Sequence, residues 1–200
     1  GLTSLSNGIL AGFKDNEVMF CEPFMPHAWP TKYRMSTDYP IVGIKAVGSS
    51  LIITTKAYPY VAQGAHPSNM TLARMRENQS CVSKRSVVGM GHSVMYASPD
   101  GLISAAGNIA TLATEKVYSR AQWQAMKPET IHGYMHEGSY VGFYTVSGVQ
   151  KGFIFNPKSL LLSDLTDVTT LTGGYANPED DALYFIDNVS QIKQFNAGTD

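Results

Sequence analysis

The chain has 200 residues, of which 44% are hydrophobic and only 16% charged, and its formal net charge is −1. So few charges indicate that part of the surface is buried against other subunits. The 15 Lys and Arg residues are scattered and are matched by 16 acidic residues. No stretch reaches the roughly 20 apolar residues of a membrane span, so we expect neither a sequence-specific nucleic-acid partner nor a membrane partner.

A unit that starts with a short apolar strand centred on glycine recurs along the chain. Its glycines are Gly12, Gly43, Gly89, Gly133 and Gly174, separated by 31, 46, 44 and 41 residues. All but the first spacing fit the four-stranded blade of a β-propeller. We expect each glycine on the innermost strand, where a residue without Cβ lets neighbouring backbones approach closely.

The repeat predicts an all-β fold, a β-propeller of about five blade-like units in one domain over residues 1–200. Five such units form either a complete small ring or an arc of a larger one. Because the chain starts at Gly1 without a methionine, we expect it to be a fragment of a longer protein.

Three segments interrupt the repeat. Residues 23–39 are rich in proline, which predicts a rigid extended loop. Residues 64–80 are polar and contain a candidate fourth strand of their blade from Met70 to Met75. The segment from Ser119 to Met126 has a serine followed three residues later by glutamine, and Pro128 comes after it. This pattern predicts a short capped helix inserted between two blades.

The turn at residues 98–101 reads Ser-Pro-Asp-Gly. An aspartate in such a turn can accept hydrogen bonds from nearby backbone amides. We therefore expect Asp100 to fix a hairpin, which is a structural role.

Cysteines and histidines give no metal or cofactor site. Cys21 and Cys81 lie in different repeats, and we expect both to be reduced and buried. His132 and His136 are four residues apart, which places them on the same side of a strand. No further ligand motif accompanies them. The sequence therefore predicts no metal and no cofactor.

A glycan-hydrolysing propeller would need two carboxylates roughly 5 to 10 Å apart. The predicted inner strands carry basic side chains such as Lys14, Lys45 and His92 but almost no acid. Glu137 is the nearest candidate, and it lies in a turn beside Gly138. We therefore predict no catalytic residues and a non-enzymatic protein.

Aromatic side chains gather in the proline-rich loop, where they form a candidate partner-binding site: Phe24, Met25, His27, Trp29 and Tyr33. Rigid aromatic side chains lose little entropy on binding, so they can anchor a partner chain. The alternative is that they pack back over the edge of the propeller itself.

Five segments together resemble a group of tailed-phage and prophage structural proteins, mostly described as tail or virion proteins. They are residues 22–30 (EPFMPHAWP), 37–43 (TDYPIVG), 81–87 (CVSKRSV), 96–102 (YASPDGL) and 119–123 (SRAQW). The resemblance extends from about Leu5 to Phe195. It implies a component of the phage tail or head-tail connector, where propeller domains occur in nozzle-like subunits, and it supplies no active-site residues.

Two functions follow from these observations. The first is a structural subunit that assembles with other tail or virion subunits or with itself, located in the virion and, during assembly, in the host cytoplasm. The second is a carbohydrate-binding or glycan-hydrolysing propeller that acts in recognition of the host surface. The low charge, the missing acids and the resemblance favour the first.

Overall fold

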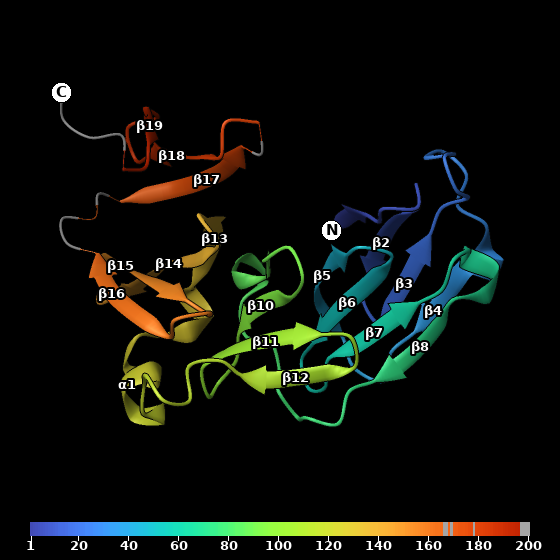
Figure 1. Ribbon diagram of the computed structural model, residues 1–200, viewed down its shortest axis with the longest axis horizontal. Coiled ribbons are helices and arrows are strands. Elements are labelled where there is room, and N and C mark those ends of the chain that lie inside the picture. Colours follow the sequence, from blue (N-terminus) through green and yellow to red (C-terminus); the bar gives the residue numbers. More distant parts are fainter. Residues whose placement is uncertain (166–167, 169, 178, 197–200) are drawn as a thin grey trace.

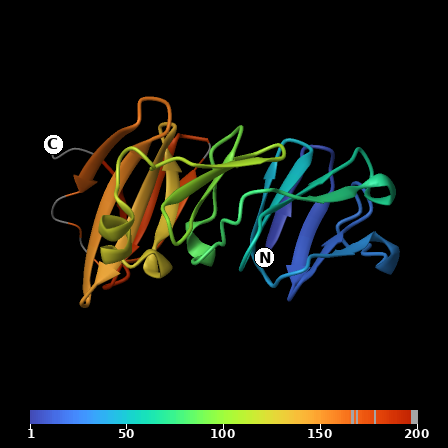
Figure 2. The same ribbon diagram turned by 90° about the horizontal axis from the view of Figure 1, so that it is seen from below.

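The structure, a computed structural model, describes residues 1–165, 168, 170–177 and 179–196. Its strands form five antiparallel sheets, and within each sheet neighbouring strands are consecutive in the chain. The sheets follow one another around an open arc, with the first sheet at one end and the fifth at the other (Figure 1). Seen from below, they stand side by side from the first, in blue, to the fourth, in orange (Figure 2). The all-β, propeller-type fold is therefore confirmed.

The first three sheets have four strands each. The first contains β1 (Leu2–Ser4), β2 (Leu10–Lys14), β3 (Glu17–Phe20) and β4 (Arg34–Ser36). The second contains β5 (Ile41–Val47), β6 (Ser50–Thr55), β7 (Tyr60–Gln63) and β8 (Thr71–Arg74). The third contains β9 (Val88–Gly89), β10 (Val94–Ala97), β11 (Leu102–Ala106) and β12 (Ile109–Leu112).

The last two sheets differ in size. The fourth has four strands, β13 (His132–His136), β14 (Ser139–Val146), β15 (Val149–Asn156) and β16 (Leu161–Leu165). Within the described residues the fifth has three, β17 (Leu171–Asn177), β18 (Ala182–Asp187) and β19 (Ile192–Gln194). Short 3₁₀ helices lie between strands: η1 (Thr31–Tyr33), η2 (Pro67–Asn69), η3 (Lys84–Ser86) and η4 (Pro128–Thr130).

The inserted helix and the predicted outer strand are both present. The helix α1 (Arg120–Ala125) lies between β12 and β13, and β8 lies within the segment expected to hold a fourth strand. Ser119 Oγ accepts a hydrogen bond from Gln122 N, and Gln122 Oε1 accepts one from Ser119 N, as a capping box requires. Among the described residues, no helix has the length and apolar composition to cross a bilayer.

The proline-rich segment is not a loop throughout. Residues 34–36 form β4, which pairs with β3 as the outer strand of the first sheet. The prolines of this segment end at Pro30. Residues beyond it keep their backbone N–H groups, and an outer strand needs a partner on one side only.

The first unit of the repeat starts earlier than predicted. Gly12 lies on β2, the second strand of its sheet, whereas Gly43, Gly89 and Gly133 lie on first strands. Gly1 directly precedes the first strand and stands 42 residues before Gly43. The first spacing is therefore short because Gly12 lies on the second strand of its sheet and not on the first. The first sheet itself has all four strands.

The glycines make room for side chains, not for neighbouring backbones as expected. A Cβ on Gly43 would lie 2.9 Å from Val87 Cγ2, in the segment that leads into the third sheet. A Cβ on Gly89 would lie 3.0 Å from Cε of Lys45 in the second sheet. At Gly43 and Gly89 the missing Cβ therefore lets successive sheets interlock.

The core lies between successive sheets because side chains of a strand alternate between its two faces. In β6, Leu51 and Ile53 pack toward the first sheet and Ile52 toward the third. In β14, Tyr140 packs toward the third sheet, whereas Phe143 packs toward the fifth. Each central sheet is thus apolar on both faces.

Both cysteines are free and buried, as predicted. Leu10 N donates a hydrogen bond to Cys21 Sγ at 3.0 Å. Cys81 Sγ donates to Ser83 O at 3.3 Å, and burial raises the pKa of the Cys81 thiol to about 11. Cys81 is therefore a protonated, unreactive thiol at neutral pH.

Candidate functional site

The dipeptide Tyr-Pro occurs in two turns, one just before the second sheet and one within it. Tyr39-Pro40 lies in the connection from β4 to β5, and Tyr58-Pro59 lies in the connection from β6 to β7. A residue that precedes proline is restricted to extended backbone conformations. Both tyrosines therefore project from stiff segments.

Hydrogen bonds of Thr37 hold the first turn. Its buried hydroxyl lies 2.7 Å from Tyr39 O and 3.1 Å from Asn16 O. Asn16 Nδ2 in turn donates to Thr37 O at 3.0 Å. The hairpin between β2 and β3, which contains Asn16, thus positions Tyr39.

The second turn is held in a similar way. Thr55 Oγ1 donates to Tyr58 O at 2.7 Å and accepts from Ala57 N at 3.1 Å. Lys56 N donates to Pro40 O at 3.0 Å, which ties the two turns together. The ring centres of Tyr39 and Tyr58 lie 6.0 Å apart with planes 36° from parallel.

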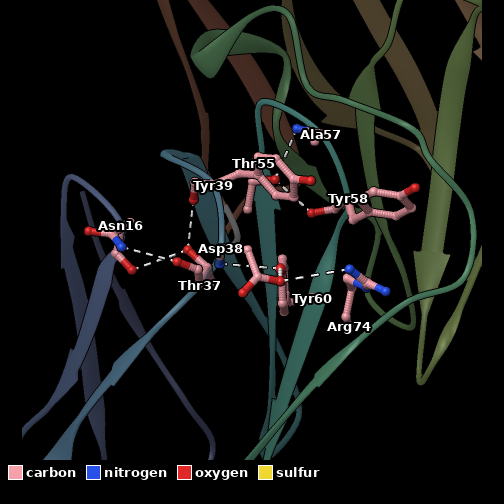
Figure 3. Close-up of polar contacts among 9 residues, drawn as sticks. All are labelled: Asn16, Thr37, Asp38, Tyr39, Thr55, Ala57, Tyr58, Tyr60 and Arg74. Carbon is pink, nitrogen blue, oxygen red and sulfur yellow. Dashed lines mark hydrogen bonds and ion pairs between the residues drawn. The ribbon is translucent and has the colours of Figure 1, made fainter.

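Charged groups lie beside the two rings (Figure 3). Tyr60 Oη donates to Asp38 Oδ2 at 2.7 Å, and Arg74 Nη1 lies 3.8 Å from the same oxygen. The Arg74 guanidinium is 4.8 Å from the centre of the Tyr58 ring, a cation–π distance. Burial raises the pKa of Tyr60, and the hydrogen bond that it donates to Asp38 adds to the shift.

We call Asp38, Tyr39, Tyr58 and Arg74 the tyrosine platform. The Asp38 and Arg74 side chains are 66% and 54% exposed, Tyr39 is 37% exposed, and Tyr58 is half-buried against the core of the first two sheets. The platform therefore presents aromatic surface, a hydrogen-bond acceptor and a hydrogen-bond donor to a ligand in solution. The platform was not among the predicted sites, although the repeated Tyr-Pro dipeptide is visible in the sequence.

The predicted partner-binding loop is divided by the structure. Tyr33 is buried in the core of the first two sheets. Trp29 is half-buried: its ring lies over Gly12, and its Nε1 donates to Pro26 O at 2.8 Å. These two aromatic side chains pack back over the protein's own edge, which is the second of the two alternatives.

The tip of the same loop points outward. Phe24 is 82% exposed and Met25 50% exposed, and His27 is exposed as well. Glu22 N donates to Ala28 O at 2.9 Å, which closes the tip into a compact turn. Phe24, Met25 and His27 thus remain as a small exposed group without the other two residues.

His132 and His136 share β13 but not a site. His132 is buried and stacks on Phe143 at 5.4 Å, whereas His136 meets the edge of Phe195 at 5.5 Å. The described residues hold no group of three or more His, Cys, Asp or Glu side chains arranged for a metal ion.

Hydrogen bonds define the state of His132. Its Nε2 lies 3.0 Å from Gln150 Nε2, and its Nδ1 lies 3.2 Å from Tyr134 Oη. Because an amide nitrogen only donates, His132 Nε2 accepts and the ring is neutral. Burial lowers the pKa of His132 to about 4, with a smaller contribution from the positive charge of Arg85.

Asp100 does not cap its own turn as expected. Ser98 Oγ accepts the hydrogen bond from Asp100 N at 3.1 Å, and Asp100 Oδ1 pairs with Arg120 Nε at 3.0 Å. The hydroxyl of the turn's first residue thus takes the role predicted for the carboxylate. The carboxylate instead holds the start of α1, so the role of Asp100 is still structural.

Within the part of the chain that the structure describes, one face of the fifth sheet is uncovered, and we call it the free face. On this face lies a groove of about 440 Å³ beside Tyr175, Tyr184, Ile186 and Ile192. Tyr175 is 63%, Ile186 43% and Ile192 71% exposed. A large apolar surface of this kind marks an interaction site more often than an ordinary surface.

Comparisons with known proteins show the fold alone. No protein-family model matches the sequence, and no curated protein matches it significantly. The N-terminal domain of Nup159 is similar over 98% of this chain and 60% of its own, with 10% identity and a TM-score of 0.56. A chain of the nidogen–laminin complex is similar over 94% of this chain and 73% of its own, with 8% identity and a TM-score of 0.54.

A third similar structure is itself a β-propeller domain, that of Cps50 (Swd1) from Myceliophteria thermophila. It matches all of this chain and 73% of its own, with 10% identity and a TM-score of 0.50. The chain thus spans between 60% and 73% of these three proteins. Together with the five sheets, these similarities identify the fold as a β-propeller.

Proposed function

We propose that this chain is a non-enzymatic structural subunit of a phage tail or head-tail connector, which assembles in the host cytoplasm and resides in the virion. Its partners are other tail subunits or further copies of itself. The observation that carries the proposal is the free face of the fifth sheet, an apolar surface at the end of the arc.

The strand register supports an interface at this face. In the fourth sheet, Gly133 pairs with Gly142, and in the fifth, Gly174 pairs with Phe185. Counted from these pairs, Ile186 corresponds to Phe143. Phe143 is 2% exposed because the fifth sheet covers it, whereas Ile186 is 43% exposed. The free face therefore repeats a surface that is covered elsewhere in the molecule.

The resemblance of five segments to phage tail and virion proteins is the reason for proposing a phage tail as the assembly. The structure puts two of these segments, 22–30 and 37–43, around the first sheet and the tyrosine platform. Neither segment contributes paired carboxylates or a metal site, so the resemblance supports a binding or assembly role.

The mass of the protein in solution tests the assembly. We expect the wild type to form a species larger than the 21.8 kDa monomer, and Ile186→Asp to return it to the monomer, because a charge buried in an apolar interface is costly. Val149→Asp is the matched control: Val149 is 59% exposed, but it starts β15, away from the free face.

Light scattering on the three proteins gives the masses, and mass spectrometry of purified virions tests the location. A monomeric wild type, or a protein absent from the particles, would contradict the proposal. Equal loss of assembly in Val149→Asp would show that the free face is not the interface.

A further inference from the structure

We propose that the tyrosine platform binds a neutral pyranose sugar. This binding function goes beyond the assembly proposed above and uses residues toward the other end of the arc, on the second sheet and in the connection that leads into it. The proposal rests on the combination of two stiffly held aromatic rings with one acceptor and one donor at the protein surface.

The exposed ring of Tyr39 supplies most of the stacking surface, and the half-buried ring of Tyr58, over which Arg74 lies, extends it. Aromatic faces carry partial negative charge, and the C–H groups of a pyranose ring carry partial positive charge, so the two surfaces attract each other. Tyr39 and Tyr58 are preorganised by the prolines that follow them and by the hydrogen bonds of Thr37 and Thr55. Little conformational entropy is therefore lost when a ligand binds.

The polar groups supply hydrogen bonds to hydroxyl groups. Asp38 uses Oδ2 for its contacts with Tyr60 and Arg74, and its side chain is 66% exposed, so Oδ1 is accessible to a ligand hydroxyl. A guanidinium has five N–H donors, and Arg74 is half-exposed. Two neighbouring hydroxyl groups of a sugar can donate to the carboxylate and accept from the guanidinium.

The balance of charge favours a neutral sugar. One carboxylate and one guanidinium lie 3.8 Å apart and compensate each other, so the platform attracts neither an anionic nor a cationic ligand strongly. The platform is also open to solvent and unlike the concave pockets that bury most of a small ligand, so we expect weak binding.

NMR titration of the whole chain with methyl glucopyranoside, methyl galactopyranoside and methyl mannopyranoside tests the proposal. We expect saturable shifts of the ring signals of Tyr39 and Tyr58 with at least one of these sugars. Tyr58→Ala should weaken binding at least tenfold, which is the loss of about 1.4 kcal/mol. Asp38→Asn should weaken it less, because the amide keeps one acceptor oxygen.

Tyr175→Ala is the matched control, since Tyr175 is an exposed tyrosine on the free face, remote from the platform. It should bind the sugar like the wild type. Circular dichroism establishes that each variant is folded, and Arg74→Gln replaces Tyr58→Ala if that variant is not. Ile186→Asp should keep full sugar binding, which separates this proposal from the assembly.

Several outcomes would overturn the proposal. They are no shift with any of the three sugars, shifts that persist in both Tyr58→Ala and Arg74→Gln, and shifts that disappear in Tyr175→Ala. A proline-rich peptide, which also docks on exposed tyrosines, serves as the competing probe. Shifts with the peptide alone would assign the platform to a protein partner instead.

Discussion

The fourth and fifth sheets pair their first two strands in a corresponding way around Gly133 and Gly174, but they differ in what covers them. Phe143 in the fourth sheet meets Phe185 of the fifth at a ring-centre distance of 5.0 Å. Its counterpart in the fifth sheet, Ile186, is 43% exposed. The fourth sheet is thus buried on both faces, whereas the fifth is buried on one and, in the described residues, has one strand fewer.

This difference shows how the fold distributes stability. Burying one large apolar side chain contributes about 1.5 to 3 kcal/mol, so a sheet with two covered faces gains from many more such contacts than a sheet with one. Substitutions at covered interfaces should therefore be costly, and equivalent substitutions on the free face should be nearly neutral when the protein is diluted until light scattering shows the monomer. Each of the following predictions tests this contrast.

The largest effect is expected at the interface of the third and fourth sheets. Trp123 of α1 is fully buried, its Nε1 donates to Ser98 O at 2.8 Å, and its ring lies 6.3 Å from that of Phe153. Trp123→Ala should lower the free energy of unfolding by about 3 to 5 kcal/mol. Urea denaturation followed by circular dichroism measures this value.

Tyr175→Ala provides the comparison on the free face. Because Tyr175 is mostly exposed in the single chain, its loss should change the free energy of unfolding of the monomer, measured at high dilution, by no more than about 0.5 kcal/mol. Similar losses in the two variants would mean that the free face is as important for stability as the covered interface, and the contrast between the sheets would fail.

The second largest effect is expected when the pH is changed, because the free energy of unfolding should depend on the protonation of His132 at the junction of the fourth and fifth sheets. His132 accepts from Gln150, and Gln150 Oε1 in turn accepts from Leu171 N at 2.5 Å. The pKa of His132 is about 4 in the folded protein, below its ordinary value of 6.5. The unfolded chain therefore binds this proton first as the pH falls.

The contribution of neutral His132 to the free energy of unfolding is fully present above about pH 6.5. It is lost as the pH falls toward 4, by up to about 3 kcal/mol. Urea denaturation at a series of pH values measures the slope. His132→Gln should remove most of it, whereas His92→Gln, at an exposed position, should leave it intact. An unchanged slope in His132→Gln would assign the dependence to other groups.

The sequence predicts the repeat because the physical cause is local. Alternating apolar residues, glycines and tight turns recur at each blade, and the helix at Arg120–Ala125 is marked by its own capping residues. The error at Gly12 arose because a glycine on a second strand looks the same in sequence as a glycine on a first strand. Only the pairing of strands separates the two cases.

The tyrosine platform was not predicted because its members are brought together by tertiary contacts. Tyr39 and Tyr58 belong to different turns, and the bond from Lys56 N to Pro40 O that joins these turns has no sequence signal. The predicted partner-binding loop is the opposite case, because neighbours in the sequence are separated in the structure. Its residues are adjacent in sequence, but Tyr33 is in the core and Phe24 is in solvent.

The smallest effect compares two adjacent glycines of β17. A Cβ on Gly174 would lie 2.7 Å from Phe185 Cδ1 and 2.9 Å from Tyr134 Cε1, toward the fourth sheet. A Cβ on Gly173, which points to the free face, would meet no atom within 4 Å. Gly174→Ala should therefore destabilise the protein by about 1 to 3 kcal/mol through overpacking.

Gly173→Ala should be neutral or stabilise the protein by up to about 1 kcal/mol, because alanine restricts the unfolded chain without a clash in the folded state. Thermal denaturation of both variants under one condition measures the difference. The two residues are adjacent glycines of the same strand, so the sign of each change depends on the face to which the new methyl group points. If both variants lost equal stability at a dilution at which the protein is monomeric, the contrast between the two faces of β17 would fail.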